Sequence, residues 1–190
     1  MNATIMGFSN FWFYNNKLAA HPSAIDNALD EFPLEFIDTA GCSYDEEINS
    51  RTVSFYNKGE ADILQKHLQN LRQSHPEPLS FGLISPYREQ VRYLETLLGN
   101  SNDTDIQTVD GFQGNEKDVI YISLVRSNDK GEIGFLADYR RMNVAMTRAR
   151  KKLVIIGDSA TIGQDKFYKA FLEYAEKHGQ YSSAWEWVGW

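Results

Sequence analysis

The stretch "TVDGFQGNEKDVIYISLVRSN", residues 108–128, decides the fold class of this sequence. Its apolar part, Val119 to Val125, is typical of a strand that is covered on both faces of a sheet. A polar segment with two glycines and three acidic residues, residues 110–118, runs directly into that strand. The rest of the chain shows how many strands of this kind the sheet contains and what lies between them.

Strands and helices are predicted to alternate along the chain. Short β-rich segments bounded by turn residues predict strands over residues 34–38, 81–85, 105–109, 118–125 and 152–158. Apolar residues at helical spacing predict helices over residues 5–14, 57–74, 85–99, 137–150 and 166–179. In the third of these helices, Ser85 is the expected N-cap and Pro86 the first helical residue. The alternation predicts an α/β fold with a mostly parallel sheet sandwiched by helices, in one domain over residues 1–190.

Composition limits the classes of protein to which the chain can belong. With 42% hydrophobic and 24% charged residues in 190, it is expected to be an ordinary globular protein. No apolar run reaches the roughly 20 residues needed to span a bilayer, and the N-terminus lacks the basic start of a secretion signal. We therefore expect a cytoplasmic protein without a membrane partner. The single cysteine, Cys42, excludes an internal disulfide and a cysteine-based zinc cluster.

The charge distribution is uneven. A net charge of −7 argues against a protein that coats nucleic acid electrostatically. Six of the 19 Lys and Arg residues nevertheless fall within residues 140–152, which predicts a local positive zone. Arg141 and Arg148 are seven residues apart, so on the predicted helix they would lie on nearly the same face. An arginine fixed on a helix is a good partner for a phosphoryl group, because its planar guanidinium stays charged and pairs two oxygens.

Polar residues follow each predicted strand, at the edge where ligands bind in open α/β sheets. Tyr87 and Arg88 follow one strand and begin a helix. The ring of Tyr87 could lie flat against a nucleobase and Arg88 could reach a phosphate. The alternative is an ordinary tyrosine whose ring lies in the core and whose hydroxyl lies in water. The Trp-rich tail, residues 181–190, is likewise either a stacking platform or a segment that docks on an apolar groove.

No phosphate-binding loop accompanies these candidates. The sequence contains no Gly-Lys dipeptide and therefore no Walker A motif. Acidic pairs at residues 30–31 and 45–46 do not follow convincing strands, so no metal site is expected in the chain. We expect that this chain alone cannot hold and hydrolyse a nucleoside triphosphate.

Three segments in order, "ISPYREQVRYLE", "TVDGFQGNEKDVIYISLVRSN" and "GFLADYRRMNVAMTRARKKLVIIGD", resemble motifs IV, V and VI of superfamily 1 helicases. The resemblance is to the Upf1-like and Dna2-like (1B) branch of 5′-to-3′ enzymes. "MGFSNFWFYNNKL" and "FIDTAG" resemble the second RecA-like domain of that family, so the similarity covers nearly the whole chain. In such enzymes two RecA-like domains close on one ATP, and the first carries the phosphate loop and the magnesium-binding acids.

The resemblance implies a role for each candidate residue. Tyr87 would flank the adenine, and Gly114 and Glu116 would meet the triphosphate and the ribose. Arg88 would approach the γ-phosphate, and Arg148 would be the arginine finger. Because the position of the first arginine varies in the family, Arg92 is an alternative to it. The residues expected to lie along the single strand are Thr108, Arg126, Ser127 and Asn128.

The resemblance also implies partners that the chain lacks. We expect ATP with Mg²⁺ to be bound jointly with a first RecA-like domain, and single-stranded DNA or RNA to be bound by both domains. ATP hydrolysis would belong to the parent helicase, and this chain alone would be inactive. Two other readings remain: a non-catalytic nucleic-acid or protein-binding module that kept the fold, and a nucleotide-binding α/β protein of another enzyme class.

Overall fold

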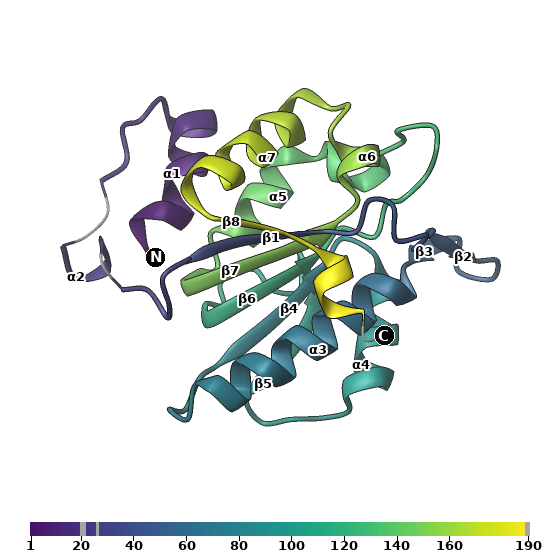
Figure 1. Ribbon diagram of the computed structural model, residues 1–190, viewed down its shortest axis with the longest axis horizontal. Coiled ribbons are helices and arrows are strands. Elements are labelled where there is room, and N and C mark those ends of the chain that lie inside the picture. The colour runs from purple at the N-terminus through teal and green to yellow at the C-terminus, as the bar shows by residue number, and fades with distance from the viewer. Residues whose placement is uncertain (20–21, 26, 189–190) are drawn as a thin grey trace.

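The computed structural model describes residues 1–19, 22–25 and 27–188, and a six-stranded sheet runs through its centre (Figure 1). The strand order is β5-β4-β6-β7-β1-β8, and every neighbouring pair is parallel. The strands are β1 (Leu34–Asp38), β4 (Phe81–Ser85), β5 (Thr104–Thr108), β6 (Lys117–Ser123), β7 (Ala149–Gly157) and β8 (Gln180–Ser183). The predicted α/β, RecA-like architecture with a parallel sheet is confirmed.

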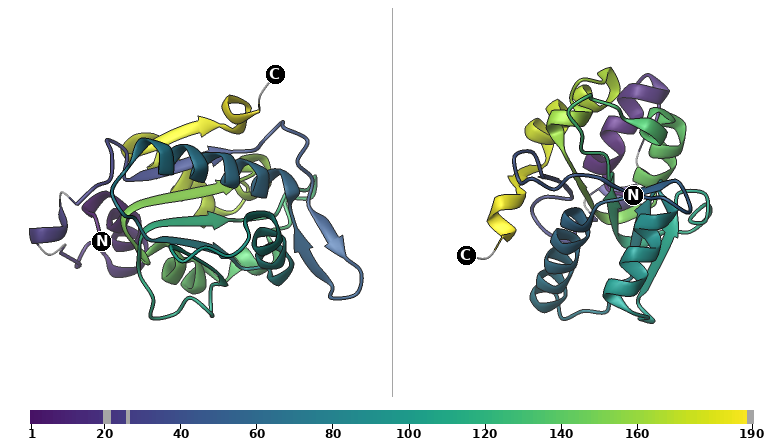
Figure 2. Two further views of the ribbon diagram at one scale, coloured as in Figure 1. Left: turned by 90° about the horizontal axis from the view of Figure 1, so that it is seen from below. Right: turned by 90° about the vertical axis from the view of Figure 1, so that its right-hand side faces the viewer.

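Helices cover both faces of the sheet, as the right-hand view of Figure 2 shows. One face carries α1 (Ala3–Tyr14), α5 (Tyr139–Met146), α6 (Ser159–Ile162) and α7 (Lys166–His178). The other face carries α3 (Lys58–Ser74) and α4 (Arg88–Leu98). Shorter elements are α2 (Pro22–Ile25), η1 (Gly134–Ala137) and η2 (Ala184–Trp187). Across the described ranges, each helix is too short or too polar to cross a membrane.

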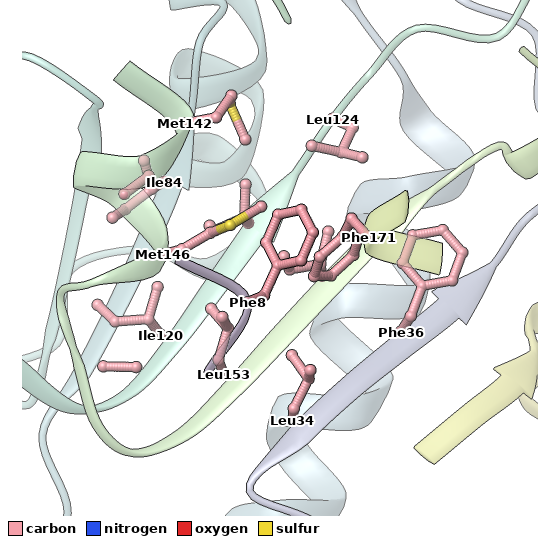
Figure 3. Close-up of a cluster of buried hydrophobic side chains, with 14 of the residues drawn as sticks. Phe8, Leu34, Phe36, Ile84, Ile120, Leu124, Met142, Met146, Leu153 and Phe171 are labelled. Carbon is pink, nitrogen blue, oxygen red and sulfur yellow. The ribbon is translucent and has the colours of Figure 1, made fainter. Parts of the chain in front are cut away.

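The core has two halves because side chains alternate across a strand. In β6, Ile120 and Ile122 point toward the α1, α5 and α7 side, whereas Val119 and Tyr121 point toward α3 and α4. The first half gathers aromatic and methionine side chains from α1, α5 and α7 over the sheet (Figure 3). Both halves share the central strands, so the sheet is held from both sides.

Two predicted helix boundaries are wrong. The helix expected over residues 85–99 begins at Arg88, with Tyr87 as its N-cap residue, because Ser85 still pairs with Thr108 in the sheet. The helix expected over residues 137–150 ends at Met146. The backbone then enters β7 at Ala149, which pairs with Lys117 of β6. Arg141 and Arg148 therefore do not share a helix.

Some elements carry no clear sequence signal. A hairpin of β2 (Glu47–Asn49) and β3 (Ser54–Tyr56) projects beside the sheet (Figure 1). The tail forms β8 and then η2, whose Trp187 ring packs with its centroid 4.8 Å from that of His67 on α3. For residues 181–188 the docking alternative is therefore confirmed. Residues 189–190 of the tail lie outside the described part, as do residues 20, 21 and 26 of the predicted domain.

Candidate functional site

A cleft of about 580 Å³ opens where the carboxyl ends of β4 and β5 meet the hairpin. Its lining comes from the hairpin, the starts of α4 and α5, the segment after β5 and η1: Thr52, Val53, Ser54, Pro86, Arg88, Thr108, Asp110, Gly111, Phe135 and Arg141. Two predicted residues, Arg88 and Thr108, thus lie in one cleft. We call it the carboxyl-edge cleft.

The two arginines of this cleft differ in their partners. Arg141, near the start of α5, pairs through its guanidinium with both carboxylate oxygens of Asp110. Arg88 is exposed, and within the described part of the chain it has neither an ion pair nor a hydrogen bond. An unpaired arginine in a cleft is free to pair with an incoming anion such as a phosphate.

The segment after β6 is engaged internally. Arg126 is buried, its Nε donates to Glu46 Oε2 at 2.7 Å, and its guanidinium lies 4.5 Å from the centroid of the Phe55 ring. The Ser127 backbone N–H and the Asn128 side chain also donate to the carboxylate of Glu46. These bonds hold the segment in place. They leave the Arg126 charge paired rather than open to a nucleic-acid strand.

Ser127 and Asn128 also line a second cleft, of about 660 Å³. Its walls are acidic, with Asp45, Glu46, Asp129 and Asp158 among the lining residues. Such walls repel phosphate, so the strand contacts predicted for residues 126–128 receive no support from the geometry.

The ring of Tyr87 lies in the core, with only 2% of the residue exposed. It packs between Phe55 and Phe135, and its hydroxyl accepts a hydrogen bond from the Phe135 N–H at 3.2 Å. Burial raises the pKa of Tyr87, although Arg126 beside it acts in the opposite direction. Other aromatic rings cover Tyr87, as in the alternative of a tyrosine whose ring lies in the core, and the adenine contact that the resemblance implies stays a prediction.

A second group of predicted residues lies at the amino edge of the sheet. Glu116 directly precedes β6 and Arg148 directly precedes β7, and the Lys117 N–H donates to the Arg148 carbonyl at 3.1 Å. Gly114 is exposed with a φ of 86°, a left-handed conformation that favours glycine. The structure thus brings the predicted contacts for ribose and triphosphate together.

The side chain of Arg148 is held by the C-terminal end of α5, the helix that precedes it. Its Nε donates to the Val144 carbonyl at 3.0 Å and its Nη2 to the Thr147 hydroxyl at 3.3 Å. A cation at this position also interacts favourably with the C-terminal end of α5. Within residues 1–19, 22–25 and 27–188, no carboxylate forms an ion pair with Arg148, and the side chain is half-buried. The guanidinium of Arg148 is therefore held in place by hydrogen bonds, and its positive charge has no carboxylate partner among the described residues.

Glu116 has a neighbour that the sequence did not suggest. Arg150 Nε lies 3.4 Å from Glu116 Oε2, and both side chains are about half exposed. Exposed pairs of this kind contribute about 0–1 kcal/mol. The pair can therefore open without a large cost if a hydroxyl-bearing ligand binds to Glu116.

The structure does not bring all predicted nucleotide contacts together. Arg88 follows the carboxyl end of β4, whereas Arg148 precedes the amino end of β7. In a parallel sheet these ends lie at opposite edges. The alternative residue, Arg92, is paired with Glu89 on the surface of α4. Neither arginine of α4 shares an edge of the sheet with Arg148.

A buried acid supports the segment after β6. The carboxylate of Glu60, on α3, accepts hydrogen bonds from the Ser123 hydroxyl at 2.7 Å and the Val125 N–H at 2.9 Å. Val125 has a φ of 72°, which is strained for a β-branched residue. Glu60 thus holds this turn. Burial raises the pKa of Glu60 to about 8, and these hydrogen bonds only partly oppose the shift.

This shift predicts that stability depends on pH. Between about pH 5 and pH 8, folded Glu60 keeps its proton while the unfolded chain has lost it, so rising pH destabilises the fold. Relative to Glu60→Gln, the wild type should lose up to about 1.4 kcal/mol per pH unit in this window. Urea unfolding of both proteins at several pH values measures the difference. Parallel pH profiles would show that Glu60 does not carry the effect.

The six-stranded parallel sheet with helices on both faces is the architecture of a RecA-like α/β domain. Within the described residues, no group of three or more His, Cys, Asp or Glu side chains could hold a metal ion. The family described as "AAA domain" matches residues 1–160. The chain belongs to this AAA domain family.

Relatives of the chain include helicases. It is 39% identical to the DNA polymerase alpha-associated DNA helicase A of Saccharomyces cerevisiae, over 94% of this chain and 29% of that protein. It is 36% identical to the DNA-binding protein SMUBP-2 of Rattus norvegicus, over 99% of this chain and 20% of that protein. An uncharacterized ATP-dependent helicase of Methanocaldococcus jannaschii is 38% identical, over 93% of this chain and 28% of that protein. The predicted relationship to helicases is confirmed, and the chain spans less than a third of these relatives.

Proposed function

We propose that this chain is the second RecA-like motor domain of a superfamily 1 helicase. In this role it supplies one side of an ATP site and part of a track for single-stranded nucleic acid. The observation that carries the proposal is the amino edge, where the uncompensated guanidinium of Arg148 lies with Gly114 and Glu116. Helicases among the relatives support it.

The residues at the amino edge fit a nucleoside triphosphate. Arg148 would pair with phosphoryl oxygens as an arginine finger, since it has charge without a carboxylate partner. The Glu116 carboxylate would accept hydrogen bonds from ribose hydroxyls, and Gly114 would let the backbone approach the nucleotide. The sequence has no Walker A loop, so in this proposal a first RecA-like domain supplies the phosphate loop and the magnesium ligands.

Nucleic acid would bind at the opposite edge. In the carboxyl-edge cleft, Thr108 would contact the strand as predicted. We assign Arg88 to a backbone phosphate of this strand rather than to the γ-phosphate, because it lies in this cleft and is unpaired. Arg126, Ser127 and Asn128 would support the wall of the track through Glu46. When ATP binding and hydrolysis close and open the two domains, the strand held at this edge would be stepped along.

Single-strand-stimulated ATP hydrolysis tests the proposal. We expect no hydrolysis by this chain alone and stimulated hydrolysis by the full-length helicase that contains it. A chain that hydrolyses ATP alone would contradict the shared site. A full-length protein that binds nucleic acid but never hydrolyses ATP would instead favour a binding module that kept the fold.

A further inference from the structure

We propose that Phe135 is a stacking platform for a nucleobase of single-stranded nucleic acid bound in the carboxyl-edge cleft. The inference rests on the proposed function, because it specifies how the nucleic-acid edge of the domain holds its ligand. Phe135 lies on η1, and 61% of it is exposed although it lines the cleft. An aromatic ring this exposed has no role in the core.

Other rings support Phe135 from behind. The Tyr87 ring lies with its centroid 5.4 Å from that of Phe135, at an interplanar angle of 31°. Phe55 contacts Tyr87 edge-on at 5.8 Å, and the Arg126 guanidinium lies over Phe55. These contacts form a row of groups that runs from the core to the cleft, and Phe135 is the exposed end of that row. A base that stacks on Phe135 would add one more ring to the row.

The backbone around Phe135 is fixed before any ligand arrives. Its N–H donates to the Tyr87 hydroxyl at 3.2 Å. Gly134 has a φ of 53°, and a Cβ there would collide with the Tyr87 hydroxyl and Arg126. Leu136 is buried, and its carbonyl accepts a hydrogen bond from the Tyr168 hydroxyl at 2.8 Å. A ring held this way loses little conformational entropy when it binds, which favours its use as a contact.

The chemistry around the ring fits a single strand rather than a protein partner. Arg88 supplies an unpaired positive charge for a phosphate on the wall of the same cleft, where Arg141 is paired with Asp110, and Thr108 supplies a hydroxyl. Aromatic rings beside basic groups are the usual means of holding unpaired strands, because every base has a face to stack. A duplex hides those faces, so the platform would select single strands.

Equilibrium binding in the absence of ATP tests this inference. Fluorescence anisotropy at low salt would measure the affinity of the chain for a labelled oligothymidine, for oligouridine, and for an abasic strand of equal length. We expect Phe135→Ala to lower the affinity for both base-bearing strands by roughly 5- to 150-fold. The abasic strand should bind to this variant and to the wild type equally. Phe135→Trp should retain affinity for both base-bearing strands.

Two variants serve as matched controls. Phe11, on α1, is 57% exposed and lies outside the cleft, so Phe11→Ala should bind all strands as the wild type does. Arg88→Ala should weaken the base-bearing and the abasic strands alike, because a phosphate contact does not depend on the base.

The inference is overturned if Phe135→Ala and Phe11→Ala have the same affinity for every strand. It is also overturned if Phe135→Ala lowers the affinity for the abasic strand as much as that for oligothymidine. It is also overturned if the wild type binds none of the strands at low salt, or if Phe135→Ala instead disrupts association with a first RecA-like domain. If Phe135→Ala binds the strands as tightly as the wild type while Arg88→Ala binds them more weakly, the stacking role of Phe135 is wrong. The proposed nucleic-acid contact at the carboxyl edge is then still supported.

Discussion

In the longer helicase proposed above, replacing Arg148 with alanine is expected to slow ATP hydrolysis by about 10³-fold or more. ATP binding should change little, because the guanidinium acts chiefly on charge that develops as the phosphoryl group is transferred. The proposed role rests on the position of Arg148: the Val144 carbonyl anchors its guanidinium, and it has no carboxylate partner within the described chain. Single-turnover hydrolysis and nucleotide binding, measured separately, distinguish the two effects.

Arg140 provides the matched control for this experiment. It is an exposed residue in the first turn of α5, the helix whose other end precedes Arg148, and we assign it no role. Arg140→Ala should hydrolyse ATP at close to the wild-type rate. Arg148→Lys should remain slow, because lysine cannot reproduce the planar fork of arginine. Normal hydrolysis by Arg148→Ala would remove the arginine finger from the proposal and leave a binding domain.

Phe112→Ala is expected to cost about 3–5 kcal/mol of the free energy of unfolding. Phe112 is 1% exposed in the segment between β5 and β6, and its ring lies against Gly82 and Ile120. Its removal leaves a cavity under the segment that carries Gly114 and Glu116. A typical domain has only about 5–15 kcal/mol of stability in total, so the midpoint of urea unfolding should fall markedly.

An exposed phenylalanine gives the comparison. Phe11→Ala removes the same side chain from the surface of α1, where a change within about 0.5 kcal/mol is expected. If both variants unfold at the same urea concentration, Phe112 does not anchor the segment. If Phe112→Ala is destabilised yet retains full nucleotide-dependent activity in the longer protein, Gly114 and Glu116 do not depend on that anchor.

The sequence predicts the fold well where local patterns and tertiary structure agree. The apolar runs of β4, β6 and β7 are short and, in β6 and β7, rich in β-branched residues, which favours strands covered on both faces of a sheet. The errors occur where long-range pairing overrides local preference. Residues 147–150 contain alanine and arginine, good helix formers, yet Ala149 pairs with Lys117 of β6 and so belongs to a strand. The edge strand β8 is short and polar, and has no pattern of its own.

The sequence indicates which residues belong to the candidate site, but it does not indicate which side chains contact them. Nothing local indicates that Arg126 is neutralised by Glu46, 80 positions away, or that Tyr87 is covered by Phe55 and Phe135. Only the three-dimensional arrangement separates a paired arginine from an available one. The exposure of Phe135 beside the cleft likewise depends on the tertiary arrangement, although an aromatic residue between a glycine and a basic helix is a local signal for it.

The helix α5 lies between the two edges to which we assign proposed contacts. Arg141 near its start belongs to the carboxyl-edge cleft, and Arg148 just past its end belongs to the amino edge. The helix is buried against β6 and β7 through Met142, Ala145 and Met146. In the proposed helicase, this close packing would keep the distance between Arg141 and Arg148 nearly constant, so the two edges would move together as one rigid body.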